Sequence, residues 1–191
     1  ELEVTVRNDS ERVQTIAVGG EVSSAFVLKG GCVTVRAGSA AKLMLRERVD
    51  GRLKLWAPGS PNLYAAVLSL KQGDRIVDNH FTRFGWRQFA IRGSDVLLNG
   101  KPIKLTGDFL HPFGPFILSR SYVQAWYRLV QDFGGNSVRP HAQPHPRNYL
   151  ELADEMGLVV LDETAIFGSA ISLNFEEPVA WQRFAEHYDG L

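Results

Sequence analysis

Residues 134–163 read GGNSVRPHAQPHPRNYLELADEMGLVVLDE, and their pattern is the clearest architectural signal in the chain. Residues 136–139 are expected to form a short strand after the two glycines. A helix is expected from near Pro146 to Gly157, because proline suits the first helical turn and glycine the residue that follows the last turn. Residues 158–161 are uniformly apolar, which is typical of a parallel strand covered on both faces. The order strand, helix, strand predicts a right-handed βαβ unit and a parallel sheet.

The same pattern extends on both sides of this stretch. A helix is expected after Ser119 or Ser121, either of which can cap it, and another from near Pro178. The apolar faces of the first two helices are predicted to be Tyr122, Trp126, Val130 and Phe133, then Tyr149, Leu152, Ala153 and Met156. The third helix is expected to include Val179, Phe184, Ala185 and Tyr188. An eight-stranded β/α barrel needs roughly 250 residues, and only about 100 follow residue 88. The second half is therefore predicted to be the start of such a barrel or a small α/β sheet.

Residues 1–88 have the pattern of an all-β domain. Apolar and polar residues alternate with a period of two over residues 2–7, 33–36 and 42–46, which indicates strands with one buried face. Turns are expected at Asn8-Asp9-Ser10, Gly19-Gly20, Gly30-Gly31 and Gln72-Gly73-Asp74. Several short strands at this spacing favour an immunoglobulin-like β-sandwich. Beyond it, residues 96–98 and 103–105 are expected to pair around a type I′ turn at Asn99-Gly100.

The composition excludes several classes of protein. The chain has 21 Lys and Arg against 21 Asp and Glu, so its charge favours neither a nucleic-acid partner nor a membrane surface. Its apolar runs are too short to span a bilayer. Cys32 is the single cysteine, which excludes a disulfide framework and a thiolate zinc site within this chain.

Five short motifs punctuate residues 55–163. They are Leu55-Trp56-Ala57-Pro58 with Pro61-Asn62-Leu63-Tyr64, then Phe84-Gly85-Trp86-Arg87, then Leu98-Asn99-Gly100-Lys101-Pro102 running on to Leu105 and Gly107, then Asn136-Ser137-Val138-Arg139, and finally residues 153–163. In this order they resemble glycoside hydrolase family 2, which includes β-galactosidases and β-glucuronidases. The resemblance implies an immunoglobulin-like β-sandwich over residues 1–88, followed by an incomplete (β/α)8 TIM barrel over residues 89–191.

The resemblance also implies a retaining glycoside hydrolase that cleaves O-glycosidic bonds of a β-linked carbohydrate. Such enzymes use two carboxylates about 5 Å apart, one as acid and base and one as nucleophile. In the family these glutamates follow the fourth and seventh strands, so we expect both downstream of Leu191 and expect the isolated chain to be inactive. No cofactor is expected, and a homo-oligomer of the full-length protein stays open.

The opening residues, Glu1-Leu2-Glu3-Val4, contain neither an initiator methionine nor a signal peptide. We therefore expect the chain to be an internal piece of a longer protein. Bacterial cytoplasmic, periplasmic and secreted locations all stay open.

Candidate site residues follow the predicted barrel strands, because barrel active sites lie at the C-terminal ends of the strands. Four are predicted to bind substrate: His111, Arg139, His141 and Glu163. A structural ion pair is an equal alternative for Arg139, and hydrogen-bonding support of the pocket is favoured for Glu163. Asp162 is expected to be a structural acceptor, and His145 to lie in an exposed loop or at a helix start. The aromatic residues available to stack on a sugar are Trp86, Phe109, Phe113 and Phe167.

His141 and His145 have a spacing that on a helix indicates zinc. Pro140, Pro144 and Pro146 forbid a regular helix there, so no metal site is expected.

Two of the site segments depart from the family pattern. Where the family usually has Gly-x-Asn-Arg-His, this chain has Gly107-Asp108-Phe109-Leu110-His111. The family's Arg-x-x-His-x-Pro becomes Arg139-Pro140-His141-Ala142-Gln143-Pro144. Both changes fall in the expected sugar-facing loops, so the sugar and the linkage stay open. A non-catalytic carbohydrate-binding module, or a structural module that uses only the sandwich, is the alternative function.

Overall fold

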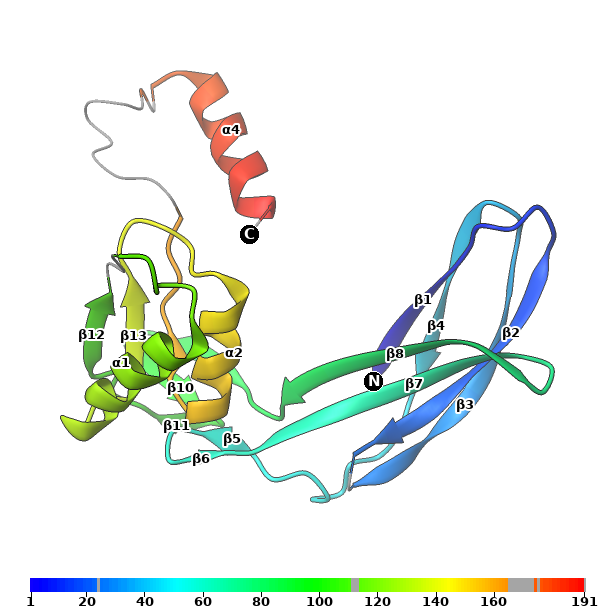
Figure 1. Cartoon of the computed structure of the whole chain (residues 1–191), viewed down its shortest axis with the longest axis horizontal. Helices are drawn as coiled ribbons and strands as arrows, with labels where there is room; N and C mark the ends of the chain where they lie inside the picture. Colours follow the sequence, from blue (N-terminus) through cyan, green and yellow to red (C-terminus); the bar gives the residue numbers. More distant parts are fainter. Residues whose placement is uncertain (24, 111–113, 165–173, 175, 191) are drawn as a thin grey trace. The chain divides into compact units, whose positions relative to one another are not determined.

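The computed structural model describes residues 1–23, 25–110, 114–164, 174 and 176–190. The chain divides into two compact units. One comprises Glu1–Trp56 and Asn62–Arg87, and the other comprises Ala57–Pro61 and Gln88–Leu191. Figure 1 shows the helices and strands of both units.

The first unit is a β-sandwich. β1 (Leu2–Asn8) pairs antiparallel with β4 (Ser39–Leu45). The second sheet has the order β3 (Phe26–Val35), β2 (Gln14–Val22), β7 (Leu63–Gln72) and β8 (Arg75–Gly85). Alternate side chains of both sheets, among them Val6, Val18 and Leu68, form one buried core. The predicted sandwich is therefore confirmed.

Two glycine pairs in this unit do not form the predicted turns. Gly19-Gly20 lies within β2 and Gly30-Gly31 within β3, and the register of β2 shifts between Val18 and Gly20. A Cβ on Gly20 would lie 2.0 Å from the carbonyl oxygen of Val67 in the neighbouring strand. The prediction was wrong because glycine serves here to let strands approach closely at a bulge, not to reverse the chain. The turn predicted at residues 72–74 does join β7 to β8.

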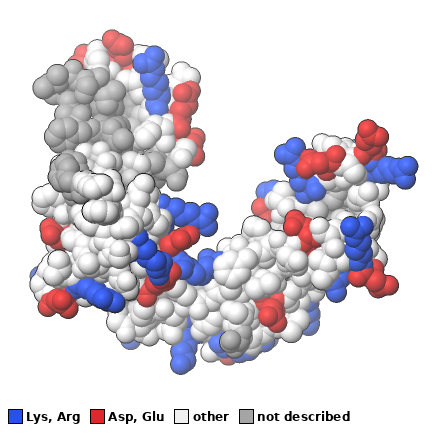
Figure 2. Space-filling model, viewed as in Figure 1, with Lys and Arg blue, Asp and Glu red and all other residues white. Residues whose placement is uncertain are grey.

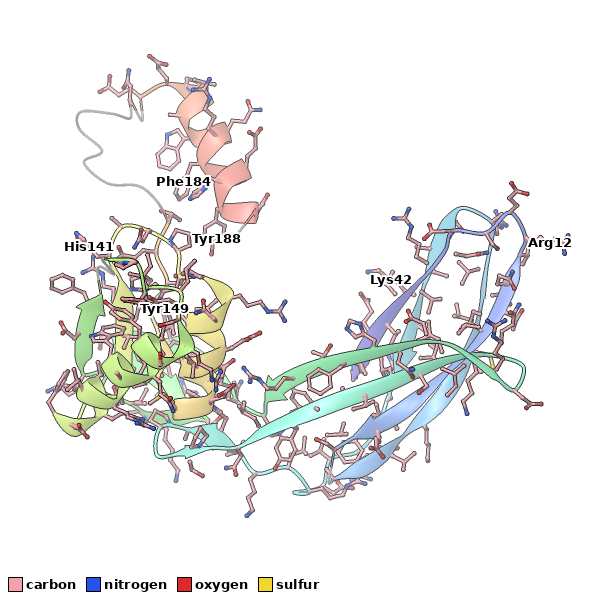
Figure 3. All side chains as sticks on the ribbon, viewed as in Figure 1. Arg12, Lys42, His141, Tyr149, Phe184 and Tyr188 are labelled. Carbon is pink, nitrogen blue, oxygen red and sulfur yellow. The ribbon has the colours of Figure 1, made fainter. Side chains whose placement is uncertain are left out.

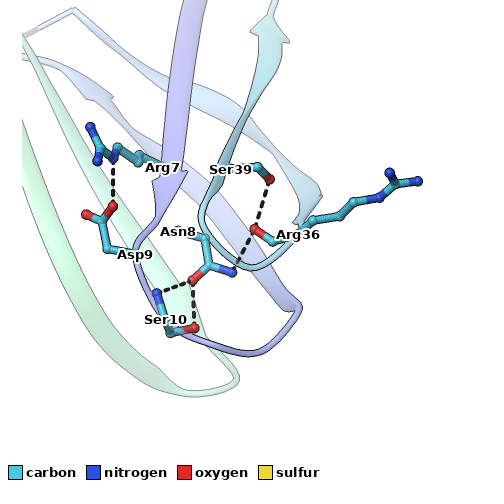
Figure 4. A network of polar contacts seen from close by, with 6 residues as sticks. All are labelled: Arg7, Asn8, Asp9, Ser10, Arg36 and Ser39. Carbon is cyan, nitrogen blue, oxygen red and sulfur yellow. Dashed lines mark hydrogen bonds and ion pairs between the residues drawn. The ribbon is translucent and has the colours of Figure 1, made fainter.

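The side chain of Asn8 ties the end of β1 to neighbouring segments. It is 7% exposed, and its Nδ2 donates to the carbonyl oxygens of Arg12, Val35 and Arg36 at 2.7, 3.1 and 3.2 Å. Its Oδ1 accepts from the backbone N–H of Ser10 at 3.0 Å and from the Ser10 hydroxyl at 2.7 Å (Figure 4). A buried amide is stable only when its polar atoms are hydrogen-bonded, so the bend after β1 is built around this side chain.

The second unit contains a parallel sheet with the order β12 (Gly107–Leu110), β13 (Ser137–Pro140) and β14 (Val159–Val160). α1 (Arg120–Asp132) lies between the first two strands in sequence and α2 (Arg147–Met156) between the second and third. Val138 of β13 packs with buried residues of both helices in one core. This arrangement is the predicted start of a β/α barrel.

Short strands precede the parallel sheet. β5 (Trp56–Ala57) pairs with β6 (Ser60–Pro61), and β10 (Asp95–Leu98) lies between β9 (Phe89–Arg92) and β11 (Lys101–Pro102). The predicted turn joins β10 to β11, with φ of 54° at Asn99 and 77° at Gly100. The return strand is residues 101–102 instead of 103–105, although Ile103 still donates its N–H to the Val96 carbonyl at 2.9 Å.

The helix faces differ in part from those predicted. Ser119, one of the two predicted caps, does cap α1. The buried residues of α1 are Val123, Tyr127 and Val130, whereas the predicted Phe133 is 56% exposed. The buried stripe follows a helical spacing of four and three residues, which the bulkier aromatic residues beside it obscured. In α2, Tyr149, Leu152 and Ala153 are buried as predicted, and the helix ends at Gly157 with φ of 77°. α4 (Pro178–Asp189) begins at the predicted proline and includes the four residues predicted for it, and none of its residues is buried among the described residues.

Charged side chains of both signs are interspersed on the face of the molecule seen in Figure 2. Among the described residues, no helix combines the length and apolar character needed to cross a membrane.

Replacing Asn8 by alanine is expected to lower the free energy of unfolding by about 2 kcal/mol, because the carbonyl groups that it serves would lose their donor in a buried position. The exposed Asn79→Ala is the matched control and should change it by less than about 0.5 kcal/mol. Urea denaturation followed by the fluorescence of Trp56, which is 0% exposed, measures both values. Equal effects of the two substitutions would contradict a structural role for Asn8.

Candidate functional site

The side chains of β13 alternate between the core face of the sheet and the opposite face. Val138 is 1% exposed and packs with α1 and α2. Successive side chains of a strand alternate between faces, so Ser137 and Arg139 project from the other face. The parallel register places Phe109 of β12 beside Arg139. An aromatic and a cationic residue therefore occupy neighbouring positions at the C-terminal ends of two strands, where barrel proteins hold their active sites.

The close approach of β12 to β13 depends on Gly107. A Cβ at this position would lie 1.8 Å from the carbonyl oxygen of Ser137, so only glycine fits. Asn136 supports the same approach, since its Oδ1 accepts from the Thr106 N–H at 2.9 Å and its Nδ2 donates to the Lys104 carbonyl at 3.0 Å. These contacts set the register in which Phe109 meets the end of β13.

Glu163 follows β14 and holds two groups at the end of β13. Its Oε1 accepts from the Nε–H of Arg139 in an ion pair, and its Oε2 accepts from the backbone N–H of Ala142 at 2.8 Å. The hydrogen bond from Arg139 holds the pKa of the Glu163 carboxyl below its usual value, and the Ala142 N–H acts in the same direction against partial burial. Both carboxylate oxygens are thus engaged by this protein's own groups.

His141 lies one residue beyond β13 and packs against Phe109. The two ring centroids are 5.5 Å apart with an interplanar angle of 54°, which is a favourable tilted geometry for aromatic rings. Figure 3 shows His141 at the end of β12 and β13. Phe109 remains 56% exposed. We refer to Phe109, Arg139, His141 and Glu163 as the strand-end cluster.

His145 lies two residues before α2, near the helix start that was one of its two predicted placements. It is buried and not exposed. Its side chain is 6% exposed, and its ring centroid lies 4.6 Å from that of Tyr149. The backbone N–H of His145 donates to Asp162 Oδ1 at 3.2 Å. Neither ring nitrogen forms a hydrogen bond with any residue that the structure describes. Burial lowers the pKa of His145 to about 4, against the opposing effect of Asp162, so its imidazole is neutral at pH 7.

Two tyrosines support His145 from the interior of the unit. The Tyr149 hydroxyl donates to the Ile117 carbonyl at 2.5 Å, and the Tyr127 hydroxyl donates to the Tyr149 carbonyl at 3.1 Å. Burial raises the pKa of both phenols, so each stays protonated and remains a hydrogen-bond donor. Figure 3 shows Tyr149 on α2, below His141.

The remaining predicted candidates are placed elsewhere or not described. His111, Phe113 and Phe167 lie outside the described residues. Trp86 belongs to the first unit, where its carbonyl oxygen accepts from the Trp56 N–H at 3.0 Å. No group of three or more His, Cys, Asp and Glu side chains that could hold a metal ion occurs in the part of the chain that is described.

Comparison with known proteins agrees with this geometry. Residues 1–87 match the family model for glycosyl hydrolases family 2, and residues 89–188 match the model for the TIM barrel domain of the same family. The chain belongs to glycosyl hydrolases family 2.

Relatives within family 2 are similar over most of the chain. A β-galactosidase of Streptococcus thermophilus is 31% identical over 137 residues, which cover 69% of this chain, and one of Priestia megaterium is 35% identical over 125 residues, which cover 63%. A crystal structure of a family 2 β-galacturonidase from Eisenbergiella tayi bound to galacturonate has a TM-score of 0.74 and 26% identity, and the match covers 85% of this chain and 29% of that one. The chain spans 12% of the length of the two β-galactosidases.

One feature of the loop after β13 had no counterpart among the predicted candidates. Ala142 has a φ of 51°, the left-handed conformation that a side chain with a Cβ rarely adopts. Alanine itself gives no signal of this backbone geometry. The only hint in the sequence is the pair of prolines, Pro140 and Pro144, which restrict the chain on either side.

The burial of the His145 imidazole makes the free energy of unfolding depend on pH. Because His145 has a pKa of about 4 when folded and about 6.5 when unfolded, the unfolded state binds more protons between these values. The free energy of unfolding should therefore fall as the pH drops from about 6.5 to about 4. His145→Phe keeps a flat ring beside Tyr149 but binds no proton, so it should remove this part of the pH dependence. Denaturation at several pH values, with NMR titration of the imidazole, measures the effect, and an imidazole that titrates near pH 6.5 would contradict it.

Proposed function

We propose that this chain contributes the immunoglobulin-like domain and the first barrel strands of a retaining glycoside hydrolase that cleaves a β-linked carbohydrate. The strand-end cluster carries the proposal, because it combines an aromatic face with polar groups at the C-terminal end of a parallel sheet. Sugars are bound in this way, with rings stacked on aromatic side chains and hydroxyl groups bound by charged and polar ones.

Within this proposal, Arg139 and His141 bind sugar hydroxyl groups, together with His111, and Phe109 offers its exposed face to a sugar ring. Glu163 belongs to the same site through its contacts with Arg139 and Ala142. The described parallel sheet has three strands, whereas the resemblance puts the acid/base after the fourth strand and the nucleophile after the seventh. The two carboxylates, which retaining hydrolysis needs about 5 Å apart, are therefore proposed to come from outside these residues.

The proposed boundary between the sandwich and the barrel domain is residue 88. The two family models adjoin there, one ending at residue 87 and the other beginning at residue 89. The second compact unit also resumes at Gln88 after the short segment Ala57–Pro61.

The enzyme that contains this chain is expected to hydrolyse one or more p-nitrophenyl β-glycosides from a panel of galactoside, glucuronide, galacturonide and glucosaminide, with the β-anomer as first product by NMR. The chain alone should release no p-nitrophenol, since it lacks the two carboxylates. Turnover by the chain alone would contradict their proposed location. Sugar binding by calorimetry without hydrolysis by the longer protein would favour the carbohydrate-binding alternative.

Arg139→Ala in that enzyme should lower kcat/KM by roughly tenfold to hundredfold, the effect of losing a charged hydrogen bond to substrate. Arg128→Ala, an exposed position of α1, is the matched control and should leave kcat/KM unchanged. Equal activities of the two variants would exclude Arg139 from the site.

A further inference from the structure

The loop that joins β13 to α2 contains a conformation that needs support. Ala142 has a φ of 51°, which is unfavourable for an L-residue because its Cβ approaches the following carbonyl oxygen. Such a conformation persists only where the surroundings fix it. The prolines at positions 140, 144 and 146 restrict the flanking chain, but none of them acts on residue 142 itself.

The support comes from the carboxylate of Glu163. One oxygen accepts the backbone N–H of Ala142 at 2.8 Å, and the other is ion-paired with Arg139 three residues earlier. A single side chain after β14 therefore joins the end of β13 to the left-handed turn that follows it. Both oxygens are occupied by this protein's own donors, so their direct effect is on the loop.

His141 lies between Arg139 and Ala142, the two residues that Glu163 contacts. Its ring meets Phe109 of the adjacent strand with 5.5 Å between ring centroids. If the turn at Ala142 opened, the backbone of the neighbouring His141 would rotate and the ring contact would be lost. The position of His141 thus depends on the Glu163 carboxylate through the loop that this carboxylate holds.

We propose that Glu163 is a positioning residue, which holds the left-handed turn at Ala142 and thereby fixes His141 against Phe109 at the sugar-binding end of the sheet. This rests on the proposed function for its consequence in catalysis, but the structural claim stands on the loop contacts alone.

A pair of substitutions in the enzyme that contains this chain tests the proposal. Glu163→Gln leaves one neutral acceptor oxygen for two donors, so the Ala142 N–H loses its carboxylate acceptor and the left-handed turn is held more weakly. KM should therefore rise about tenfold, with a smaller change in kcat. Ala142→Gly removes the cost of the left-handed turn. In the Glu163→Gln background it should recover most of the lost affinity, while by itself it should change KM less than about twofold.

The matched control is Glu155→Gln, which breaks the ion pair between Arg120 and Glu155 away from the loop and should leave KM unchanged. If glycine at position 142 fails to recover KM, Glu163 acts through Arg139 or directly on the substrate, and the proposal is overturned.

A second measurement does not depend on catalysis. The ring protons of His141 should show a ring-current shift from Phe109 in the NMR spectrum, lose it in Glu163→Gln and regain it in the double variant. An unchanged shift in Glu163→Gln would overturn the positioning role. If the enzyme hydrolyses no glycoside but the shift behaves as expected, the proposed function fails and the positioning role stands.

Discussion

The alternation of side chains along β13 is the constraint on which the site depends. Val138 is buried against α1 and α2 on the helix side of the sheet, so Arg139, the next residue, has to project from the other side. A shift of the strand by one residue would exchange these faces and place a guanidinium in the apolar core. The packing of α1 and α2 on Val138 therefore fixes the direction of the arginine, and Gly107 lets β12 come close enough to place Phe109 beside it.

The contacts of Glu163 matter more for geometry than for stability. Its ion pair with Arg139 joins side chains that are 26% and 51% exposed, and such pairs contribute only about 0–1 kcal/mol. The left-handed turn at Ala142 costs roughly 1–2 kcal/mol. A hydrogen bond between its N–H and a carboxylate contributes about 1.5–3 kcal/mol. The cost of the turn and the gain from this hydrogen bond nearly offset one another. The carboxylate therefore selects one loop conformation without making the folded state much more stable.

The sequence allowed the order of strands and helices to be predicted because hydrophobic period and turn residues are local signals. It also grouped Arg139, His141 and Glu163 at one end of the sheet, since parallel strands bring their C-terminal ends together. The remaining features depend on contacts between segments. Gly20 was predicted as a turn residue because nothing local reveals that Val67 lies against it. The burial of His145 depends on Tyr149 packing against its ring, and the φ of Ala142 depends on an acceptor that follows β14.

The two departures from the family pattern meet in space. Phe109 stands where family 2 usually has asparagine after the first barrel strand, and His141 stands one position before the usual histidine after the second. The rings of these two residues are in contact across β12 and β13. An asparagine at position 109 would offer no ring for the histidine to pack against, and a histidine at position 142 would itself occupy the left-handed turn that Glu163 holds. The two changed positions therefore lie against one another in this chain, as an aromatic pair at the end of the sheet.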